Sequence, residues 1–454
     1  MKTLSHDIHV VNRLDLNPPK SLLENNDKTT LIVDKTPFLS GIVKASPSKS
    51  YTQRAIMVGG INGNVTVINP LFAADTRSTI NVWRELGATI KIESDRLRID
   101  GFSGSPKPRG NTINVNESGT LLRFVLPILA LAKGEFTVEG KGTLLERSNK
   151  TIVEALQSWG IEISGRGKEH KLPIRIKGQG EIRGGRTFVN GEEGSQVVSS
   201  LLIAAPFAKK NTTIVMSNKL VSRPYVDITI DVLRQAGIKI RKKGYEEFSI
   251  KCNQQLKMDE NYAVHGDYSS AAFLIAAACL VPSDVTIEDL IDDEQGDKKI
   301  IAILRKMGAK IEQTGNTVKI KGPFELHGVN IDGSDIPDLV PILSTVACFA
   351  KGKTKISHIS HLAHKESNRI TAPAGELNKL GADIATTKDS LTITHSHLTS
   401  GQVSACNDHR LAMSFLVAGL RSGGIVINGV DCISKSYPLF LDHMKALGAN
   451  FKFV

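Results

Sequence analysis

The chain has 454 residues, of which 41% are hydrophobic and 23% charged, and its formal net charge is +11. This is the composition of a soluble globular protein; the length predicts two or three domains, and the longest apolar runs, such as residues 273–281, are too short to cross a membrane. Aromatic residues make up only 5% and no block of five or six basic residues occurs, so a small anionic substrate explains the positive charge at least as well as nucleic acid does.

The N-terminal segment and the cysteines indicate the compartment. Residues 1–28 are polar and mixed in charge, without the apolar stretch of a secretion signal, and their acidic residues argue against an organelle transit peptide. We expect them to form a poorly ordered extension. The five cysteines show no CxxC spacing, and Cys279 and Cys348 lie in apolar helical runs. The sequence therefore predicts a cytoplasmic protein without structural zinc.

A pattern of about 70 residues repeats six times. Each copy has apolar residues one and four positions before a glycine, and one and three positions after it, which predicts an amphipathic helix, a glycine cap and a strand. These glycines are spaced 67 to 77 residues apart: Gly87, Gly160, Gly237, Gly308, Gly381 and Gly448. Six units predict an α/β protein with two domains of three units each, divided near residues 261–266.

Each copy also contains an earlier helix that is apolar nearly all round and is expected to be buried. In chain order these helices open at residues 48–55, 117–124, 195–202, 268–275, 337–344 and 407–414. The amphipathic helices open at residues 75–80, 146–152, 222–228, 295–300, 365–370 and 435–440. Because backbone N–H groups at helix starts attract anions, converging starts predict a cleft with a positive lining between the domains.

Cations gather at these helix starts, where the helix dipole disfavours them unless an anion is bound. Taken singly, several are explained equally well as solvated or surface charges. Lys365 and Arg369 have the i,i+4 spacing of one helix face and would repel each other unless an anion bridges them. Arg410 lies inside an apolar helix, where an unpaired cation is costly. The complete set is Lys49, Arg54, Arg147, Lys365, Arg369, Arg410 and Lys435.

Two carboxylates, Asp338 and Glu366, lie among these cations, although Asp338 is also interpretable as a helix N-cap. Nearby cations lower carboxylate pKa values, which favours at least one ionised general base. Side chains that suit a polyhydroxylated or phosphorylated ligand are Ser195, Gln196, Ser222 and Tyr225. Such a set predicts two multiply charged substrates and proton transfer by the two carboxylates.

From about residue 29 to its end, the sequence resembles the 5-enolpyruvylshikimate-3-phosphate synthase family of enolpyruvyl transferases. The segments that carry the resemblance are "SKS", "SGT", "LVSRPYVDIT", "QGDK", "IPDLVPIL", "KESNR" and "NDHRLAM". The resemblance implies two domains of three βαβαββ units each, in an inside-out α/β barrel arrangement, with two chain crossings. The N-terminal domain would be residues 47–263, and the C-terminal domain residues 29–46 plus 264–454.

The resemblance also implies the reaction. The enolpyruvyl (1-carboxyvinyl) group of phosphoenolpyruvate would pass to the 5-hydroxyl of shikimate-3-phosphate through a tetrahedral intermediate, with release of phosphate. This is a step of the shikimate pathway to chorismate and the aromatic amino acids. The resemblance implies no cofactor or metal and no nucleic-acid or membrane partner, and we expect a monomer that glyphosate inhibits in competition with phosphoenolpyruvate.

The family's site residues are carried over by motif. Asp338 would be the base for the 5-hydroxyl, Glu366 the acid that protonates the phosphoenolpyruvate methylene, and Lys49 a further catalytic residue. The phosphoenolpyruvate site would comprise Lys49, Gly119, Arg147, Arg369, Arg410 and Lys435. The shikimate-3-phosphate site would comprise Lys49, Ser50, Arg54, Ser195, Gln196, Ser222, Tyr225, Asp338 and Lys365.

Three positions depart from the common family pattern. Glu117 stands where many members have asparagine, Gly194 replaces a usual serine, and His361 replaces a usual asparagine. These changes bear on affinities and inhibitor response more than on the reaction, and Glu117 either pairs with a neighbouring cation or weakens substrate binding.

Two alternative functions compete with this one. The sister enolpyruvyl transferase that acts on UDP-N-acetylglucosamine usually carries a loop cysteine ahead of the arginine matching Arg147, and the stretch "EGKGTLLER" has none. A catalytically silent anion- or nucleic-acid-binding protein on the same scaffold would not use Asp338 and Glu366, and it would bind polynucleotides in a salt-dependent manner.

Overall fold

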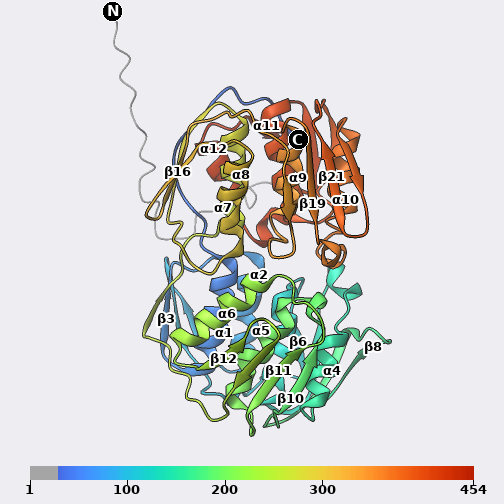
Figure 1. Cartoon of the computed structure of the whole chain (residues 1–454). Coiled ribbons are helices and arrows are strands. Elements are labelled where there is room, and N and C mark those ends of the chain that lie inside the picture. Colours follow the sequence, from blue (N-terminus) through green and yellow to red (C-terminus); the bar gives the residue numbers. More distant parts are fainter. Residues whose placement is uncertain (1–28) are drawn as a thin grey trace, which may run out of the picture.

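The computed structural model describes residues 29–454, and these form two lobes (Figure 1). A cavity lined by residues of both lobes lies between them. The extension predicted for residues 1–28 lies outside the described residues. In the described part, 24 strands form six sheets of four strands each. No described helix has the combination of length and apolar character that a membrane span requires.

All six sheets share one pairing pattern, so the sixfold repeat in the sequence is also a repeat of the strand pairing. In the sheet β6-β7-β9-β8, β6 is parallel to β7, whereas β9 is antiparallel to both β7 and β8. Three sheets of the first lobe are built from β3 (Val65–Ile68), β4 (Thr89–Ile92), β5 (Arg96–Asp100), β6 (Thr112–Asn114), β7 (Lys133–Glu139), β8 (Glu162–Arg166), β9 (Lys171–Gln179), β10 (Arg186–Val189), β11 (Thr212–Met216), β12 (Ile240–Lys243), β13 (Glu247–Ile250) and β14 (Asn261–Ala263).

The three sheets of the second lobe include two strands from the start of the chain. Strand β2 pairs with β15, and β1 lies between β23 and β24. The strands of this lobe are β1 (Thr30–Val33), β2 (Leu39–Lys44), β15 (Ser283–Glu288), β16 (Ile311–Thr314), β17 (Thr317–Ile320), β18 (Asn330–Asp332), β19 (Lys353–Ser357), β20 (Asp383–Thr386), β21 (Ser390–Thr394), β22 (Gly401–Ser404), β23 (Ile425–Asn428) and β24 (Phe451–Phe453).

Six helices are buried over most of their surface and form the centre of the lobes, as their apolar sequences predicted. All residues of α7 are buried, for example. These central helices are α1 (Lys49–Asn62), α3 (Gly119–Ala130), α5 (Ser195–Ala204), α7 (Tyr268–Leu280), α9 (Val340–Cys348) and α11 (His409–Ser422).

Six amphipathic helices each bury one face and end two residues before a glycine of the repeat. All six glycines have positive φ values, between 81° and 113°, which glycine adopts without strain. The predicted glycine caps are therefore confirmed. The helices are α2 (Ala74–Glu85), α4 (Lys150–Ser158), α6 (Arg223–Gln235), α8 (Lys299–Lys306), α10 (Thr371–Lys379) and α12 (Phe440–Ala446).

Buried apolar side chains form two separate clusters. One runs from Tyr51 to Val264, and the other combines residues 31–45 with residues 268–451. The chain crosses between them twice, and the crossings lie side by side, since the Ser48 N–H donates to the His265 carbonyl oxygen at 2.8 Å. We propose that the two clusters are the cores of the domains at residues 47–263 and at residues 29–46 plus 264–454.

Candidate active site

A cavity of about 190 Å³ lies between the lobes and is lined from both sides. Twelve of the fifteen site residues predicted from sequence line it: Lys49, Ser50, Arg54, Gly119, Arg147, Ser195, Gln196, Tyr225, Asp338, Lys365, Glu366 and Arg369. The other three, Ser222, Arg410 and Lys435, do not line the cavity. The segments that the repeats place in equivalent positions thus meet on one surface.

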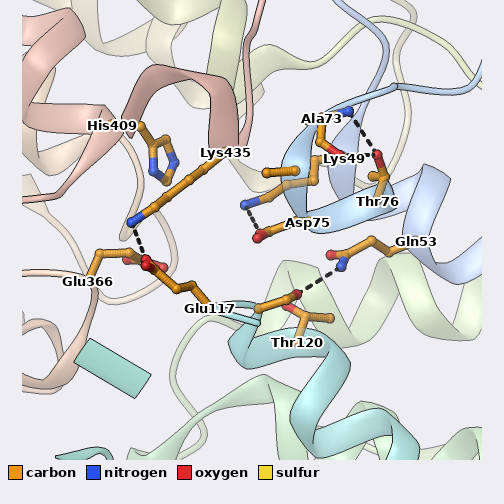
Figure 2. Close-up of polar contacts among 12 residues, drawn as sticks. Lys49, Gln53, Ala73, Asp75, Thr76, Glu117, Thr120, Glu366, His409 and Lys435 are labelled. Atoms are coloured by element: carbon orange, nitrogen blue, oxygen red, sulfur yellow. Dashed lines mark hydrogen bonds and ion pairs between the residues drawn. The ribbon is translucent and has the colours of Figure 1, made fainter. Parts of the chain in front are cut away.

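Lys49 begins α1 because Ser48 caps the helix, its hydroxyl accepting from the Tyr51 N–H. The Lys49 ammonium donates to Asp75 Oδ2 at 3.1 Å, a contact visible in Figure 2. Burial acts to lower the pKa of Lys49, but Asp75 and the other nearby carboxylates outweigh it, so the net pKa is raised. Lys49 is therefore a charged group at the cavity wall. Sequence reasoning missed Asp75, an ordinary acidic residue in a first helical turn.

Arg54 uses its donors inside the protein. It is 2% exposed, and its guanidinium donates to Thr229 Oγ1 at 2.7 Å and to the carbonyl oxygens of Ser50 and Tyr225 at 3.0 Å each. It also lies over the Phe124 ring, 5.3 Å from the centroid. Arg54 thus joins α1 to α6 at the cavity wall, and most of its hydrogen-bonding capacity is already satisfied.

Arg123 is a buried cation of the cavity that sequence reasoning missed. Its guanidinium donates to the carbonyl oxygens of Ser148 at 2.9 Å and Gly119 at 3.3 Å. Burial, followed by the charge of Arg147, lowers its pKa to about 9. The signal was present in the sequence, because Arg123 interrupts an otherwise apolar helix just as Arg410 does.

Arg369 is the centre of the charged network. It is 1% exposed and contacts three carboxylates: Asp338 Oδ1 at 2.5 Å, Glu366 Oε2 at 2.8 Å and Asp408 Oδ2 at 2.8 Å. Arg147 approaches Glu366 Oε1 at 3.6 Å from the other lobe. The two proposed proton carriers are thus held on one buried guanidinium.

Asp338 receives hydrogen bonds from both lobes. Arg410 Nη2 donates to its Oδ2 at 3.0 Å, and the hydroxyl of Tyr225 donates to the same oxygen at 2.7 Å. Arg410 is buried and also donates to the Ser269 carbonyl oxygen at 2.9 Å, so the buried cation predicted inside this helix is paired.

The cavity fixes the charge of its acids and bases. Burial acts to raise the pKa of Asp338, but Arg410 and Arg369 lower it far below the usual range. Burial likewise acts to raise the pKa of Glu366, and Arg369 and Arg147 outweigh it, so that its pKa lies well below its usual value. Burial lowers the pKa of Lys365. Both carboxylates are therefore ionised in the ligand-free protein.

The helix-start interpretations of Lys365, Arg369 and Asp338 do not hold in detail. Lys365, Glu366 and Arg369 lie in the turn between the 3₁₀-helix η5 (Ser360–His364) and α10, so Lys365 and Arg369 do not share a helix face. Asp338 lies two residues before α9 and accepts from side chains instead of capping the helix.

Two further cations also differ from the helix-start prediction. Lys435 ends the 3₁₀-helix η6 (Val430–Lys435), well before α12, and Arg147 lies between the 3₁₀-helix η1 (Gly142–Glu146) and α4. These two cations therefore lie in the segments that precede the amphipathic helices α4 and α12, and not in the first turns of those helices.

The predicted hydroxyl and amide ligands are placed by α5 and α6. Ser195 begins α5, and Gln196 Nε2 donates to Thr120 Oγ1 at 3.1 Å. Ser222 has a left-handed backbone at φ 55°, and its buried hydroxyl has no partner among the described residues. Its N–H donates to the Ser334 carbonyl oxygen in the other lobe.

The three departures from the family pattern lie at or beside the cleft. Glu117 pairs with Lys435 at 2.6 Å. Gly194 has φ 102°, so the serine usual at this position would be strained here. His361 lines the cavity with neither ring nitrogen partnered in the described structure, and burial lowers its pKa to about 3.

The model of the EPSP synthase (3-phosphoshikimate 1-carboxyvinyltransferase) family matches residues 33–444. The chain belongs to this family. The 3-phosphoshikimate 1-carboxyvinyltransferase of Methanocaldococcus jannaschii is 40% identical over 427 residues, which cover 93% of this chain and 99% of the relative. The enzyme of the same name from Methanococcus maripaludis is 38% identical over 93% of this chain and 100% of its own length.

Solved structures agree with this assignment. An EPSP synthase from Acinetobacter baumannii has a TM-score of 0.79 and 26% identity, covering 94% of this chain and 99% of its own. The enolpyruvyl transferase NikO from Streptomyces tendae, at 17% identity and a TM-score of 0.74, shares the fold. The predicted EPSP synthase family, the enolpyruvyl transferase fold and the transferase class are confirmed, and the alternative functions are not favoured.

Proposed function

We propose that this cleft transfers the enolpyruvyl group of phosphoenolpyruvate to the 5-hydroxyl of shikimate-3-phosphate and releases phosphate. The observation that carries the proposal is the pairing of Asp338 and Glu366 on the single guanidinium of Arg369, inside a cavity lined by cations from both lobes. Two acidic groups that differ in their neighbours suit a reaction that takes one proton and gives another.

Phosphoenolpyruvate would be held by cations from both lobes. Lys49 and Arg147 approach from the first lobe, and Gly119 leaves room for the ligand beside Arg147. The phosphate and the carboxylate need donors on opposite sides, which a cleft between two lobes supplies. The cations from the second lobe would be Arg369, Arg410 and Lys435.

Shikimate-3-phosphate would occupy the half of the cavity beside α5 and α6. The start of α5 offers backbone N–H groups to the 3-phosphate. Asp338 and Lys365 would contact the ring hydroxyls from the second lobe. The side chains assigned to this ligand from the first lobe are Lys49, Ser50, Arg54, Ser195, Gln196, Ser222 and Tyr225, of which Arg54 acts mainly by holding α1 to α6.

The chemistry uses the two carboxylates in turn. Asp338 takes the proton of the 5-hydroxyl while the hydroxyl oxygen forms a bond to C2 of phosphoenolpyruvate. Glu366 gives a proton to the methylene carbon. The Glu366 carboxylate then takes a proton back from the resulting methyl group while the C–O bond to phosphate breaks, so that phosphate leaves with the bonding electrons and the enolpyruvyl ether remains. The fixed cations, Lys49 among them, stabilise the charge that develops on the phosphate.

Glu366 must carry a proton to act as the acid, yet Arg369 and Arg147 keep it ionised in the ligand-free protein. Phosphoenolpyruvate resolves this conflict, because its own negative charges bind the same two arginines and add repulsion beside Glu366. Both effects raise the pKa of Glu366 once the substrate is bound. The substrate thereby favours protonation of its own acid catalyst.

The remaining parts of the proposal concern the state of the protein. We propose a cytoplasmic monomer that acts on these two small molecules, without a nucleic-acid or membrane partner. Both lobes of one chain supply the cleft, which is consistent with activity in a single copy.

Release of phosphate from phosphoenolpyruvate tests this function. The full chain is assayed with shikimate-3-phosphate or with UDP-N-acetylglucosamine as the acceptor. We expect turnover only with shikimate-3-phosphate, and formation of the enolpyruvyl ether confirmed by mass. Turnover only with UDP-N-acetylglucosamine, or with neither acceptor, rejects the proposal.

A further inference from the structure

Glu117 and Lys435 form an ion pair across the cleft, with 2.6 Å between Oε2 and Nζ. Glu117 lies just before Ser118, the N-cap of α3 in the first lobe, and Lys435 ends η6 in the second lobe. Figure 2 shows the two side chains meeting end to end, with Glu366 beside them. Their side chains are 24% and 15% exposed, so solvent screens the pair only in part.

The donors of Lys435 are fully engaged. Its ammonium also donates to the carbonyl oxygen of Asn407 at 3.1 Å and to Asn407 Oδ1 at 3.0 Å. An ammonium has three N–H donors, and with Glu117 these contacts account for all of them. An anion that reaches Lys435 must therefore displace one partner. Asn407 belongs to the same lobe as Lys435, whereas Glu117 is contributed by the opposite lobe.

The position of Glu117 is fixed by its surroundings. Asn407 Nδ2 also donates to Glu117 Oε2 at 3.4 Å. The Glu117 side chain packs against Gly142, where an added Cβ would lie 2.7 Å from Oε1. Gly142 has φ 60°, which also favours glycine. The Glu117 carboxylate thus lies between Gly142, which has no side chain, and the side-chain amide of Asn407.

From this geometry we infer that Glu117 is a built-in competitor of phosphoenolpyruvate for Lys435. The Glu117 carboxylate binds the Lys435 ammonium and so connects the two lobes at this edge of the cleft. It moves away from Lys435 when the anionic substrate binds. Glu117 is a positioning residue that sets affinity for phosphoenolpyruvate and takes no proton in the reaction. The inference deepens the proposed function and rests on the assignment of Lys435 to phosphoenolpyruvate.

The test is Glu117→Gln, which keeps the size of the side chain and removes its charge. We expect KM for phosphoenolpyruvate to fall about three- to tenfold, as for loss of a partly exposed charge competitor, with kcat within about twofold. The KM for shikimate-3-phosphate should stay unchanged. An unchanged or increased KM for phosphoenolpyruvate overturns the inference.

A double-mutant cycle separates this effect from a general change in charge. In a Lys435→Gln background, Glu117→Gln should no longer alter KM for phosphoenolpyruvate, and an equal fall in both backgrounds rejects the competition. Glu146→Gln is the matched control, because it removes a carboxylate that pairs with Lys171 at 2.7 Å on the surface. This control should leave both KM values unchanged.

Two readouts need no turnover, so the inference and the proposed function fail separately. Titration calorimetry with phosphoenolpyruvate alone, in the absence of shikimate-3-phosphate, should show tighter phosphoenolpyruvate binding to Glu117→Gln than to the unaltered chain. Small-angle scattering should show a larger radius of gyration for ligand-free Glu117→Gln, because one tie between the lobes is lost. Equal affinity and equal radius reject the inference, whereas absent turnover of the unaltered chain rejects the proposed function alone.

Discussion

The hydroxyl of Tyr225 donates a hydrogen bond to Asp338 Oδ2 at 2.7 Å and so connects α6 of the first lobe to the turn before α9 of the second. Burial, followed by the charge of Asp338, raises the pKa of Tyr225 far above its usual value. Tyr225 therefore stays a neutral donor at neutral pH. The proposed base is held by two arginines and by one donor without charge.

Removing this donor should weaken use of shikimate-3-phosphate. For Tyr225→Phe we expect kcat/KM for shikimate-3-phosphate to fall about tenfold, because a hydrogen bond to a charged group contributes roughly 1.5–3 kcal/mol. Steady-state kinetics at saturating phosphoenolpyruvate measures this. The control is Tyr51→Phe, whose hydroxyl also contacts both lobes, at Asp231 and the Glu294 N–H, outside the cavity lining. An equal loss in both variants contradicts the assignment of Tyr225.

Replacing the proposed acid should affect turnover far more than binding. For Glu366→Gln we expect kcat to fall by about 10²- to 10⁴-fold, the usual contribution of general acid–base catalysis, while both KM values change by less than about fivefold. Phosphate release measures kcat. Glu325→Gln removes an exposed carboxylate paired with Lys351 and serves as the control. A kcat for Glu366→Gln within tenfold of the unaltered chain would show that another group delivers the proton.

A side chain at Gly119 should interfere with phosphoenolpyruvate. An added Cβ would lie 2.9 Å from Arg147 Nη1 and 3.3 Å from Arg123 Nη1, so at least one guanidinium must move. For Gly119→Ala we expect KM for phosphoenolpyruvate to rise about tenfold, or roughly 1.4 kcal/mol, and KM for shikimate-3-phosphate to stay unchanged. If both KM values rise equally, the substitution has disturbed the cleft as a whole.

Glyphosate should compete with phosphoenolpyruvate. Its phosphonate and carboxylate are two anionic groups on a short chain, and the cations proposed for phosphoenolpyruvate recognise the same charges. Initial rates over a grid of inhibitor and phosphoenolpyruvate concentrations should give competitive inhibition. Inhibition independent of phosphoenolpyruvate concentration would place glyphosate at another site.

Asp297 should make stability depend on pH. It is 2% exposed, Ser269 donates to its Oδ2, and its Oδ1 has no partner among the described residues. Burial, then the charge of Asp338, raises its pKa to about 7, while Arg410 partly offsets this. Since the ordinary pKa is 3.8, the unfolded chain loses this proton first. Asp297 therefore costs stability as pH rises from about 4 to about 7, and the cost is complete above that range.

For Asp297→Asn we expect a higher free energy of unfolding than for the unaltered chain at pH 8, by at most roughly 4 kcal/mol, given about three pKa units at 1.36 kcal/mol each. At pH 4 the difference should vanish. Urea unfolding at the two pH values measures it, and a difference that does not depend on pH contradicts the prediction.

The repeat in the sequence was enough to predict the architecture. Apolar positions around Gly87 and its five equivalents fixed the helix ends, because a positive φ after a helix has few solutions other than glycine. The buried helices followed from their composition. The completion of the sheet β22-β23-β1-β24 did not follow from the repeat, since β1 pairs with strands almost 400 residues later and no local pattern encodes that pairing.

Most residues of the site could be predicted from the sequence, whereas their arrangement in space could not. Sequence periodicity predicts side-chain directions only in regular helices. Lys365, Glu366 and Arg369 lie in a turn, where their spacing in the sequence does not predict which way their side chains point. Asp408 was missed for another reason: it is the N-cap of α11 and also contacts Arg369, 39 residues away. Local sequence explains the first role and says nothing of the second.

The place of β1 between β23 and β24 sets an order of events on the ribosome. Residues 47–263 emerge with every strand of their three sheets, and this lobe is complete once β14 has been made. Strand β1 has been synthesised earlier, but its two neighbours appear only when translation nears residue 453. Leu31 and Val33 therefore have no strand partners until β23 and β24 have been made, so we expect the sheet β22-β23-β1-β24 to be the last of the six to be completed during synthesis.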